Sequence, residues 1–476
     1  MRPLPPAVLI ASLLALPAFA DAITFIDHAP WDAARMPVEV DQSQLQGILP
    51  KQELDRLIKA GRELFGTKFT TADGVGRPLA TQAQIPTHFK HPRQQVFQRA
   101  SGPDSNACSS CHNNPDWGGA GDFTGNAFTS GGTESADFDT VDAQFSNERN
   151  TNHMFGSGLE ELLAREMTAD LQTERENAVK QARDTGKPVT ISLTTKTINY
   201  GSLTANPDGT LDTSKVDGID PDLVVRPFSQ KGVFTSLRSF TVTVLNAHLG
   251  MQADERFGAR MTGEADFDGD GVTHEITDGQ VSALVAFQAT LAPPMPTPFD
   301  NPEWNAMADK GKALFTQIGC AECHHPYLPL KSLKFSDPSP YDTAGTLSAR
   351  DVAEPAVYDL AMLDWAKKLP RDKDGNYLVP LFGDLKRHVI ADAQHNHYGD
   401  ELMGQSFVPR DIFMTAELWG VADTAPYGHR GDLTELSQAI LAHGGEGTKA
   451  RDAYAALSKE EQNDLITYLM TLRMPK

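Results

Sequence analysis

Four cysteines and two histidines form two short strings whose spacing allows a prosthetic group to be attached. The strings are Cys108-Ser-Ser-Cys111-His112 and Cys320-Ala-Glu-Cys323-His324, and together they use every cysteine of the chain. In a Cys-x-x-Cys-His string, the two thiols add to the vinyl groups of haem, and the histidine becomes a ligand of its iron. We therefore expect two covalently bound c-type haems, with His112 and His324 as the proximal iron ligands.

A pair of zinc sites or redox-active dithiols is the alternative for these strings. Zinc requires four thiolates, or thiolates and histidines, that converge on one ion. A redox dithiol has no need of a histidine directly after its second cysteine. Two complete strings with no cysteine left over favour haem attachment, and they also predict that the chain contains no disulfide.

A second group of residues has the spacing of a calcium-binding loop. The segment Asp266-Phe-Asp268-Gly-Asp270-Gly-Val272 places three carboxylates at alternate positions, and the Val272 carbonyl can add a fourth oxygen. The glutamate that closes an EF-hand loop is replaced by Thr277, which leaves Glu275 as the candidate for that role. A solvated acidic turn is the alternative. We predict a structural calcium site on Asp266, Asp268, Asp270, Val272 and Glu275.

The whole chain has the charge and composition of an exported globular protein. Its formal net charge of −21 over 476 residues argues against any general attraction to nucleic acid or to anionic lipid. Residues 1–20 are typical of an export signal, with Arg2, an apolar run from Val8 to Leu16, and Ala18-Phe-Ala20 before the cleavage point. The apolar run is too short to span a bilayer, so we expect a periplasmic location and no stable membrane insertion.

The elements around the two strings predict a mainly α fold with two cytochrome c-like haem domains. Apolar residues recur at helical spacing over residues 54–65 and 304–315, and a glycine in each stripe, Gly61 or Gly311, allows another helix to cross closely. Ser458 and Glu461 predict the capped start of a C-terminal helix. We place an N-terminal haem domain at 21–290, a proline-rich linker at 291–303 and a C-terminal haem domain at 304–476. A loop at 70–107 and a small β-containing region at about 187–235 are insertions in the first domain.

Several further segments carry a resemblance to a known family. They are Arg99 to Asn113, Met154 to Glu160, Leu418-Trp-Gly420, Thr424-Ala-Pro-Tyr427 with His429, and Ala442-His-Gly-Gly-Glu446. Together they resemble the bacterial di-haem oxidoreductase/putative peroxidase family, which is related to the di-haem cytochrome c peroxidases and to the maturation enzyme of methylamine dehydrogenase. The resemblance implies that one haem reacts with peroxide or oxygen while the other is a six-coordinate electron relay.

The resemblance also points to the sixth ligand of the second iron. The peroxidases have methionine, and the maturation enzyme tyrosine, at a position after the Pro-Tyr-x-His-x-Gly loop that corresponds here to His443. On spacing alone, His443 can equally be a helix-end histidine that faces the C-terminal dipole. Ligation by two histidines would lower the potential of this iron relative to a histidine–methionine pair. For His388, Met414 and His429 we expect loop or packing roles.

The far side of the first haem is less defined by the sequence. Residues 113–147 contain no histidine, and His153 and His248 are the nearest candidates, for each of which packing is the alternative. A weaker likeness to the di-haem rubber oxygenases implies an apolar distal face, which Phe234 can supply unless it is ordinary core. Peroxide cleavage needs a group that moves a proton between the two oxygens. The glutamate of the related peroxidases corresponds to Glu160 or Glu161.

Three functions are compatible with these residues. The first is a peroxidase that reduces hydrogen peroxide at the His112 haem, with electrons from a small donor protein of cytochrome c or cupredoxin type. The second is an oxygenase that activates dioxygen and cleaves an organic substrate. The third is an electron carrier without a substrate. The long segment between the two strings, with its β-containing region and acidic loop, favours an enzyme.

Overall fold

The computed structural model describes residues 22–76, 105–129, 146–342, 344–399 and 407–475. The predicted export signal and most of the inserted loop at 70–107 lie outside these residues. The α-helices are α1 (Lys51–Gly66), α4 (Ser157–Thr185), α5 (Leu237–Val244), α6 (Asp254–Phe257), α7 (Ala259–Thr262), α8 (Asp278–Thr290), α9 (Pro302–Gln317), α10 (Leu436–Leu441), α11 (Thr448–Ala456) and α12 (Lys459–Leu469). In this part of the chain, no helix combines the length and apolar character needed to cross a membrane.

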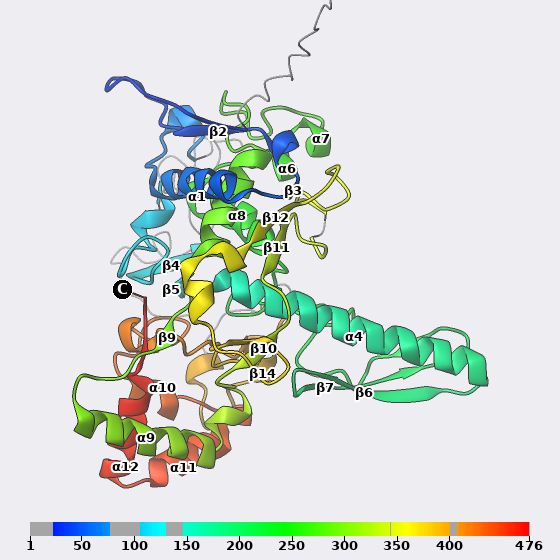
Figure 1. Cartoon of the computed structure of the whole chain (residues 1–476), viewed down its shortest axis with the longest axis vertical. Coiled ribbons are helices and arrows are strands. Elements are labelled where there is room, and N and C mark those ends of the chain that lie inside the picture. The colour runs from blue at the N-terminus through cyan, green and yellow to red at the C-terminus, as the bar shows by residue number, and fades with distance from the viewer. Residues whose placement is uncertain (1–21, 77–104, 130–145, 343, 400–406, 476) are drawn as a thin grey trace, which may run out of the picture.

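The helix pair α1 and α8 forms the centre of the N-terminal half. Leu54, Leu57 and Leu64 of α1 are buried, and a Cβ atom on Gly61 would clash with the carbonyl of Ala283 in α8. The helix therefore lies where the apolar spacing predicted it, and Gly61 is the residue that lets the two backbones approach. Figure 1 shows this pair in the upper part of the molecule.

The C-terminal half repeats this construction with α9 and α12. Asn301 caps α9 and Pro302 begins it, while Ser458 and Glu461 form the predicted capping box of α12. A Cβ atom on Gly311 would clash with the carbonyl of Asp464, so α9 and α12 cross at this glycine as predicted. Phe315 and Tyr468 stack edge to face beside the crossing, with ring centroids 5.6 Å apart. Figure 1 shows α9, α11 and α12 together in the lower part of the molecule.

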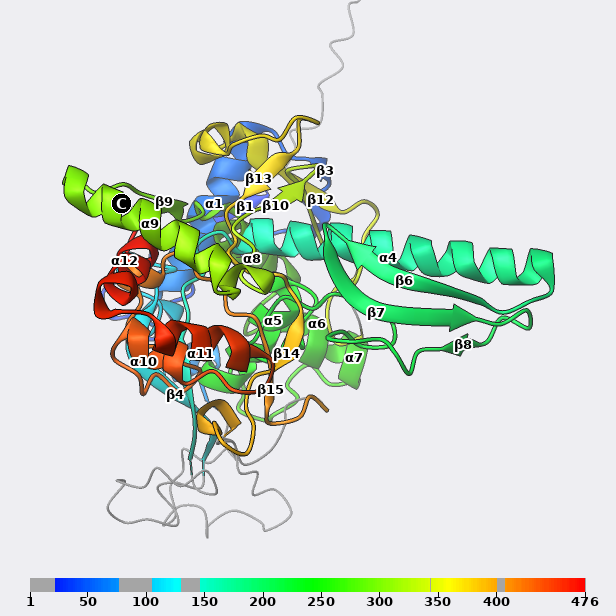
Figure 2. The same cartoon turned by 90° about the horizontal axis from the view of Figure 1, so that it is seen from below.

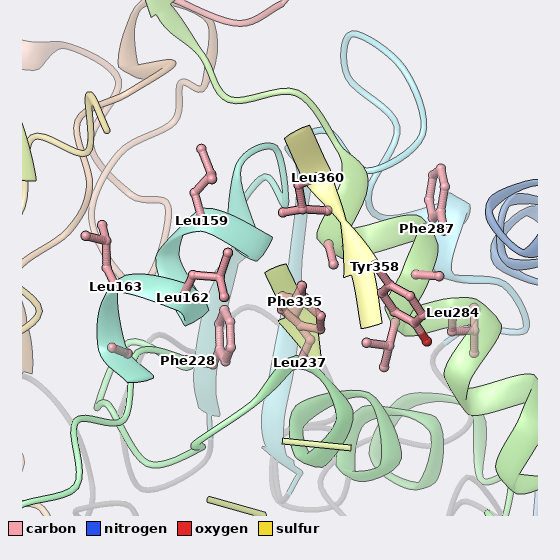
Figure 3. Packing of buried hydrophobic residues seen from close by; sticks show 14 of the residues in the cluster. Leu159, Leu162, Leu163, Phe228, Leu237, Leu284, Phe287, Phe335, Tyr358 and Leu360 are labelled. Carbon is pink, nitrogen blue, oxygen red and sulfur yellow. The ribbon is translucent and has the colours of Figure 1, made fainter. Parts of the chain in front are cut away.

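Strands from the C-terminal half return to the N-terminal half. Strand β12 (Ala356–Asp359) pairs antiparallel with β11 (Lys334–Asp337) and parallel with β3 (Gly47–Ile48), which precedes α1. Phe335 and Tyr358 of this sheet stack in a buried cluster with leucines of α4, α5 and α8, as Figure 3 shows. This cluster also contains Leu381 and Leu385. The hydrophobic packing therefore crosses the linear boundary at 291–303.

The remaining strands include those of an arm that extends from the body. The arm consists of α4 and a three-stranded sheet, β6 (Val189–Thr195), β7 (Ile198–Ala205) and β8 (Leu211–Asp212), as Figures 1 and 2 show. The other strands are β1 (Ile23–Phe25), β2 (Val38–Val40), β4 (Gly121–Thr129), β5 (Ser146–Thr151), β9 (Met295–Pro296), β10 (Leu328–Leu330), β13 (Tyr377–Val379), β14 (Arg387–Val389), β15 (Ile412–Met414) and β16 (Leu472–Arg473). Strand β9 lies in the proline-rich linker and pairs with β16.

Candidate functional site

The first Cys-x-x-Cys-His string folds into a single tight turn next to α1. A 3-10 turn spans Cys108–Ser110, and the main-chain N–H of His112 donates to the Cys108 carbonyl at 3.1 Å. This turn brings the two thiols and the imidazole into one place. His112 Nδ1 donates to the Gly119 carbonyl at 3.3 Å, and its ring lies 6.3 Å from the Phe65 ring of α1. Burial is the main cause that lowers the pKa of His112 to about 4.

The second string repeats this geometry after α9. A 3-10 turn spans Cys320–Glu322, and the main-chain N–H of His324 donates to the Cys320 carbonyl at 3.0 Å. His324 Nδ1 donates to the Phe382 carbonyl at 3.1 Å. Burial, with a smaller contribution from His443, lowers the pKa of His324 to about 4. Cys108, Cys111, Cys320 and Cys323 are each partly exposed.

His443 lies just beyond the end of α10 and interacts electrostatically with His324. Its Nδ1 donates to the Ala439 carbonyl at 2.8 Å, and the Tyr398 hydroxyl donates to the same carbonyl at 3.1 Å. The Tyr398 ring is perpendicular to the His443 ring, at 89° and 5.6 Å between centroids. These contacts fix both the position and the orientation of the imidazole. Burial lowers the pKa of His443 as well.

The three histidines have the properties that iron ligation requires. A carbonyl can only accept a hydrogen bond, so the Nδ1 atom that faces it carries the proton and leaves the lone pair on Nε2. Metal-bound histidines are typically held by such a bond, and they must be neutral when they bind. The cysteines, His112 and His324 therefore have the donor chemistry that a haem at each string would need, and His443 has that of a further iron ligand.

The three competing residues on the second side have other contacts. Both ring nitrogens of His388 face carboxylates, at 2.7 and 2.8 Å. The Met414 side chain lies against Gly232, and the His429 ring lies 4.6 Å from the Phe413 ring. The loop and packing roles expected for His388, Met414 and His429 stay predictions.

The two neighbouring glutamates of α4 have different environments. Glu161 is fully buried and forms an ion pair with Arg165 at 2.5 Å, while its other oxygen accepts the Leu237 N–H at 2.8 Å. Leu237 is the first residue of α5, so Glu161 joins the beginnings of two helices. These contacts engage both carboxylate oxygens of Glu161.

Glu160 is buried and shares a hydrogen bond with Glu417, a residue that the sequence did not single out. Burial first, and then the neighbouring carboxylate, raise the pKa of Glu160 well above its usual range. Burial also raises the pKa of Glu417. Two carboxyl groups can share a hydrogen bond only if one of them carries a proton, and the raised pKa values of Glu160 and Glu417 favour that protonated form. The next N–H, that of Leu418, donates to the Phe382 carbonyl, which also accepts from His324.

Two of the three candidates for the far side of the first haem lie near His112. His248 and His153 lie close enough to contribute to the lowered pKa of His112. His153 Nε2 donates to the Trp419 carbonyl at 2.8 Å, which ties the N-terminal half to the C-terminal half. Phe234 is partly buried and packs edge to face on Phe240, with centroids 5.3 Å apart.

The acidic loop brings three of its five predicted ligands together. One carboxylate oxygen from each of Asp266, Asp268 and Asp270 lies within 4.8 Å of the others. Asp266 accepts N–H groups of Gly269 and Gly271 at 2.8 and 3.0 Å, and Asp270 accepts the Val272 N–H at 2.7 Å. Glu275 is directed elsewhere, because it is buried and accepts the Gln252 N–H at 2.6 Å.

Comparisons with known proteins place this chain in no established family. No family model matches the sequence, and no curated protein matches it. Hydrazine synthase of Kuenenia stuttgartiensis is 14% identical over 91% of this chain and 98% of its own, with a TM-score of 0.32. A MauG-like protein associated with microbial copper homeostasis is 14% identical over 90% of this chain and 93% of its own, with a TM-score of 0.29. At these TM-scores neither likeness carries an argument about fold or function.

Proposed function

We propose that this chain is a periplasmic di-haem c-type cytochrome oxidoreductase of the peroxidase type. The observation that carries the proposal is the matched geometry of the two Cys-x-x-Cys-His strings. Each ends in a partly buried imidazole with a lowered pKa, whose Nδ1 faces a main-chain carbonyl, and His443 lies near the second one with the same arrangement. In this proposal His112 would hold the haem at which hydrogen peroxide is reduced, and His324 with His443 would hold the haem that receives electrons from a small donor protein.

The carboxyl pair Glu160–Glu417 adds the proton chemistry that an oxidoreductase needs. Reduction of a peroxide consumes protons, and a carboxyl group with a raised pKa delivers them best near neutral pH. Glu160 comes from the N-terminal half and Glu417 from the C-terminal half, next to the loop that supports His324. We propose this pair as the proton store of the reaction.

We also propose that the acidic loop binds Ca²⁺ through Asp266, Asp268 and Asp270. The proposal rests on the alternate spacing of the three residues and on the convergence of their oxygens. Glu275 is left out of this ligand set because its carboxylate is already engaged by Gln252.

The test of the main proposal begins with haem content. The full chain is produced in a host that attaches c-type haem, and haem is counted by the pyridine haemochrome spectrum. We expect two haems per chain, and one after either Cys108→Ser with Cys111→Ser or Cys320→Ser with Cys323→Ser. A chain that acquires no haem would overturn the proposal.

Spectroscopy and turnover then separate the three functions. A peroxidase should show one high-spin and one low-spin signal in the EPR spectrum of the oxidised protein, together with peroxide-dependent oxidation of a reduced donor. Two low-spin signals without turnover would indicate an electron carrier. Dioxygen uptake with an organic substrate, but no peroxide turnover, would indicate an oxygenase with Phe234 at its distal face.

A further inference from the structure

The side chain of His388 connects two carboxylates from different segments. Its Nε2 donates to Asp384 at 2.8 Å, and its Nδ1 donates to Glu446 at 2.7 Å. His388 and Asp384 are buried, whereas Glu446 is partly exposed. Burial opposes the charge of His388, but its contacts with Asp384 and with Cys323 of the second string outweigh burial and raise its pKa to about 11.

The Glu446 end of this chain of hydrogen bonds belongs to the His-Gly-Gly-Glu motif that begins with His443. The second oxygen of Glu446 accepts the Val389 N–H at 2.9 Å. Gly444 donates to the Ile390 carbonyl at 2.8 Å, and Gly445 donates to the Asp392 carboxylate at 2.7 Å. These hydrogen bonds hold the motif against β14 and the residues that follow β14.

The two glycines of the motif allow this close approach. A Cβ atom on Gly445 would clash with the Val389 carbonyl, and Gly445 has a φ of +50°. A Cβ atom on Gly444 would press on the carbonyl of His395. Any side chain at these positions would push the motif away from β14, and His443 would move with it.

The Asp384 end belongs to the segment that supports His324. Asp384 is two residues after Phe382, whose carbonyl accepts from His324 Nδ1 at 3.1 Å. The segment is itself fixed, because Asp384 also accepts the Lys386 N–H at 3.0 Å. The His388 side chain thus links the segment of Phe382 and Asp384, which contacts His324, to the motif that contains His443.

We propose that His388 is a positioning residue that holds His443 at the correct separation and orientation toward His324. The inference rests on the proposed function, since it requires that both histidines ligate one haem iron. His388 acts through the Asp384–His388–Glu446 chain, and its side chain also contacts Cys323 of the second string. The His-Gly-Gly-Glu motif is then one unit, with a ligand at its first position and an anchor at its last.

The test compares the low-spin EPR signal of the oxidised, haem-loaded protein across four variants. His388→Ala removes both bonds, and Glu446→Ala removes one. We expect each to abolish the wild-type low-spin signal in most molecules, and a shifted or high-spin signal should replace it. Glu446→Gln should keep the wild-type signal, because its amide can donate to a neutral His388 that still donates to Asp384. His274→Ala breaks an exposed histidine–aspartate pair, His274–Asp254 at 2.7 Å, and should change nothing.

His443→Ala is measured in parallel to separate iron ligation by His443 from the positioning role of His388. If it abolishes the low-spin signal while His388→Ala and Glu446→Ala leave it intact, the positioning role is refuted and ligation stands. If His443→Ala leaves the signal intact, ligation itself fails. Should His388→Ala not fold, the Glu446→Ala and Glu446→Gln pair decides alone, since a partly exposed glutamate tolerates replacement. Equal spectra for that pair would overturn the positioning role.

Discussion

The histidines near the second Cys-x-x-Cys-His string are of two kinds, which differ in the groups that their ring nitrogens face. His324 and His443 face main-chain carbonyls with Nδ1, and burial keeps them neutral. His388 faces carboxylates with both nitrogens, and its pKa is raised. The sequence contains three similar histidines within reach of one site, and only their partners distinguish a ligand from a residue that holds a ligand in place.

The pair Glu160–Glu417 predicts how the free energy of unfolding depends on pH. Both pKa values are raised in the folded state, so above the ordinary carboxyl range the folded protein binds more protons than the unfolded chain. Stability should therefore fall as pH rises from about 5 to 8, at up to about 1.4 kcal/mol per pH unit for each retained proton. Glu417→Gln should flatten this slope, measured by chemical denaturation at several pH values. The exposed Glu303→Gln should keep the wild-type slope, and identical slopes in all three proteins would refute the shared proton.

At the scale of elements, two crossings of helices at glycine organise the two halves. In each half a helix that precedes a Cys-x-x-Cys-His string meets a later helix at a glycine, Gly61 with α8 and Gly311 with α12. The crossing sets the position of the helix and, through it, of the string that follows. The positions of His112 and His324 thus depend on two residues that have no side chain.

The crossing at Gly311 predicts a large effect of a single methyl group. Gly311→Ala improves helix propensity, but its Cβ would clash with the Asp464 carbonyl. Overpacking of this kind costs about 1–3 kcal/mol, so we expect a lower midpoint of thermal unfolding. Lys312→Ala, on the exposed side of the same helix, is the control and should be nearly neutral. Equal midpoints for the two variants would mean that α9 and α12 are not in contact at Gly311.

The acidic loop predicts a stabilising effect of Ca²⁺. A ligand that binds only the folded state stabilises it by about 2.7 kcal/mol at a concentration one hundred times its dissociation constant. We expect Ca²⁺ to raise the unfolding midpoint of protein treated with a chelator, and Asp268→Asn to weaken binding at least about tenfold in calorimetric titration. Asp208→Asn, in another acidic turn, is the control. If Ca²⁺ gives no heat and no change in midpoint, the loop is a solvated turn.

Elements fixed by neighbouring residues could be predicted from the sequence, whereas contacts between distant segments could not. The capping box of Ser458 and Glu461 and the apolar stripes of α1 and α9 are local patterns, and the structure contains them. Glu417 carried no local signal, because its partner Glu160 lies far away in the chain. The pairing of β12 with β3 and the bond between His388 and Glu446 were missed for the same reason.

At the scale of the whole molecule, the segment that contacts His324 packs in both hydrophobic clusters. Leu381 and Leu385 pack in the cluster that contains α1, α4 and α8, whereas Phe382, between them, packs with Phe315 and Tyr468 of the C-terminal helices. The carbonyl that faces His324 therefore belongs to a residue held by both halves. A change in the packing of either half would shift Phe382 and so disturb the hydrogen bond between its carbonyl and His324.

The net charge of −21 predicts which donor proteins reduce the haem-loaded chain fastest. Opposite charges accelerate encounter, and dissolved salt screens this attraction over about 10 Å at 0.1 M ionic strength. Reduction by a basic c-type cytochrome should therefore be fast at low ionic strength and fall about tenfold by 0.2 M, in stopped-flow absorbance measurements. An acidic cytochrome of similar potential should be slow at low ionic strength and gain speed with salt. If both donors show the same flat dependence, the acidic surface has no part in choosing the partner, because a local docking patch would then outweigh the charge of the whole molecule.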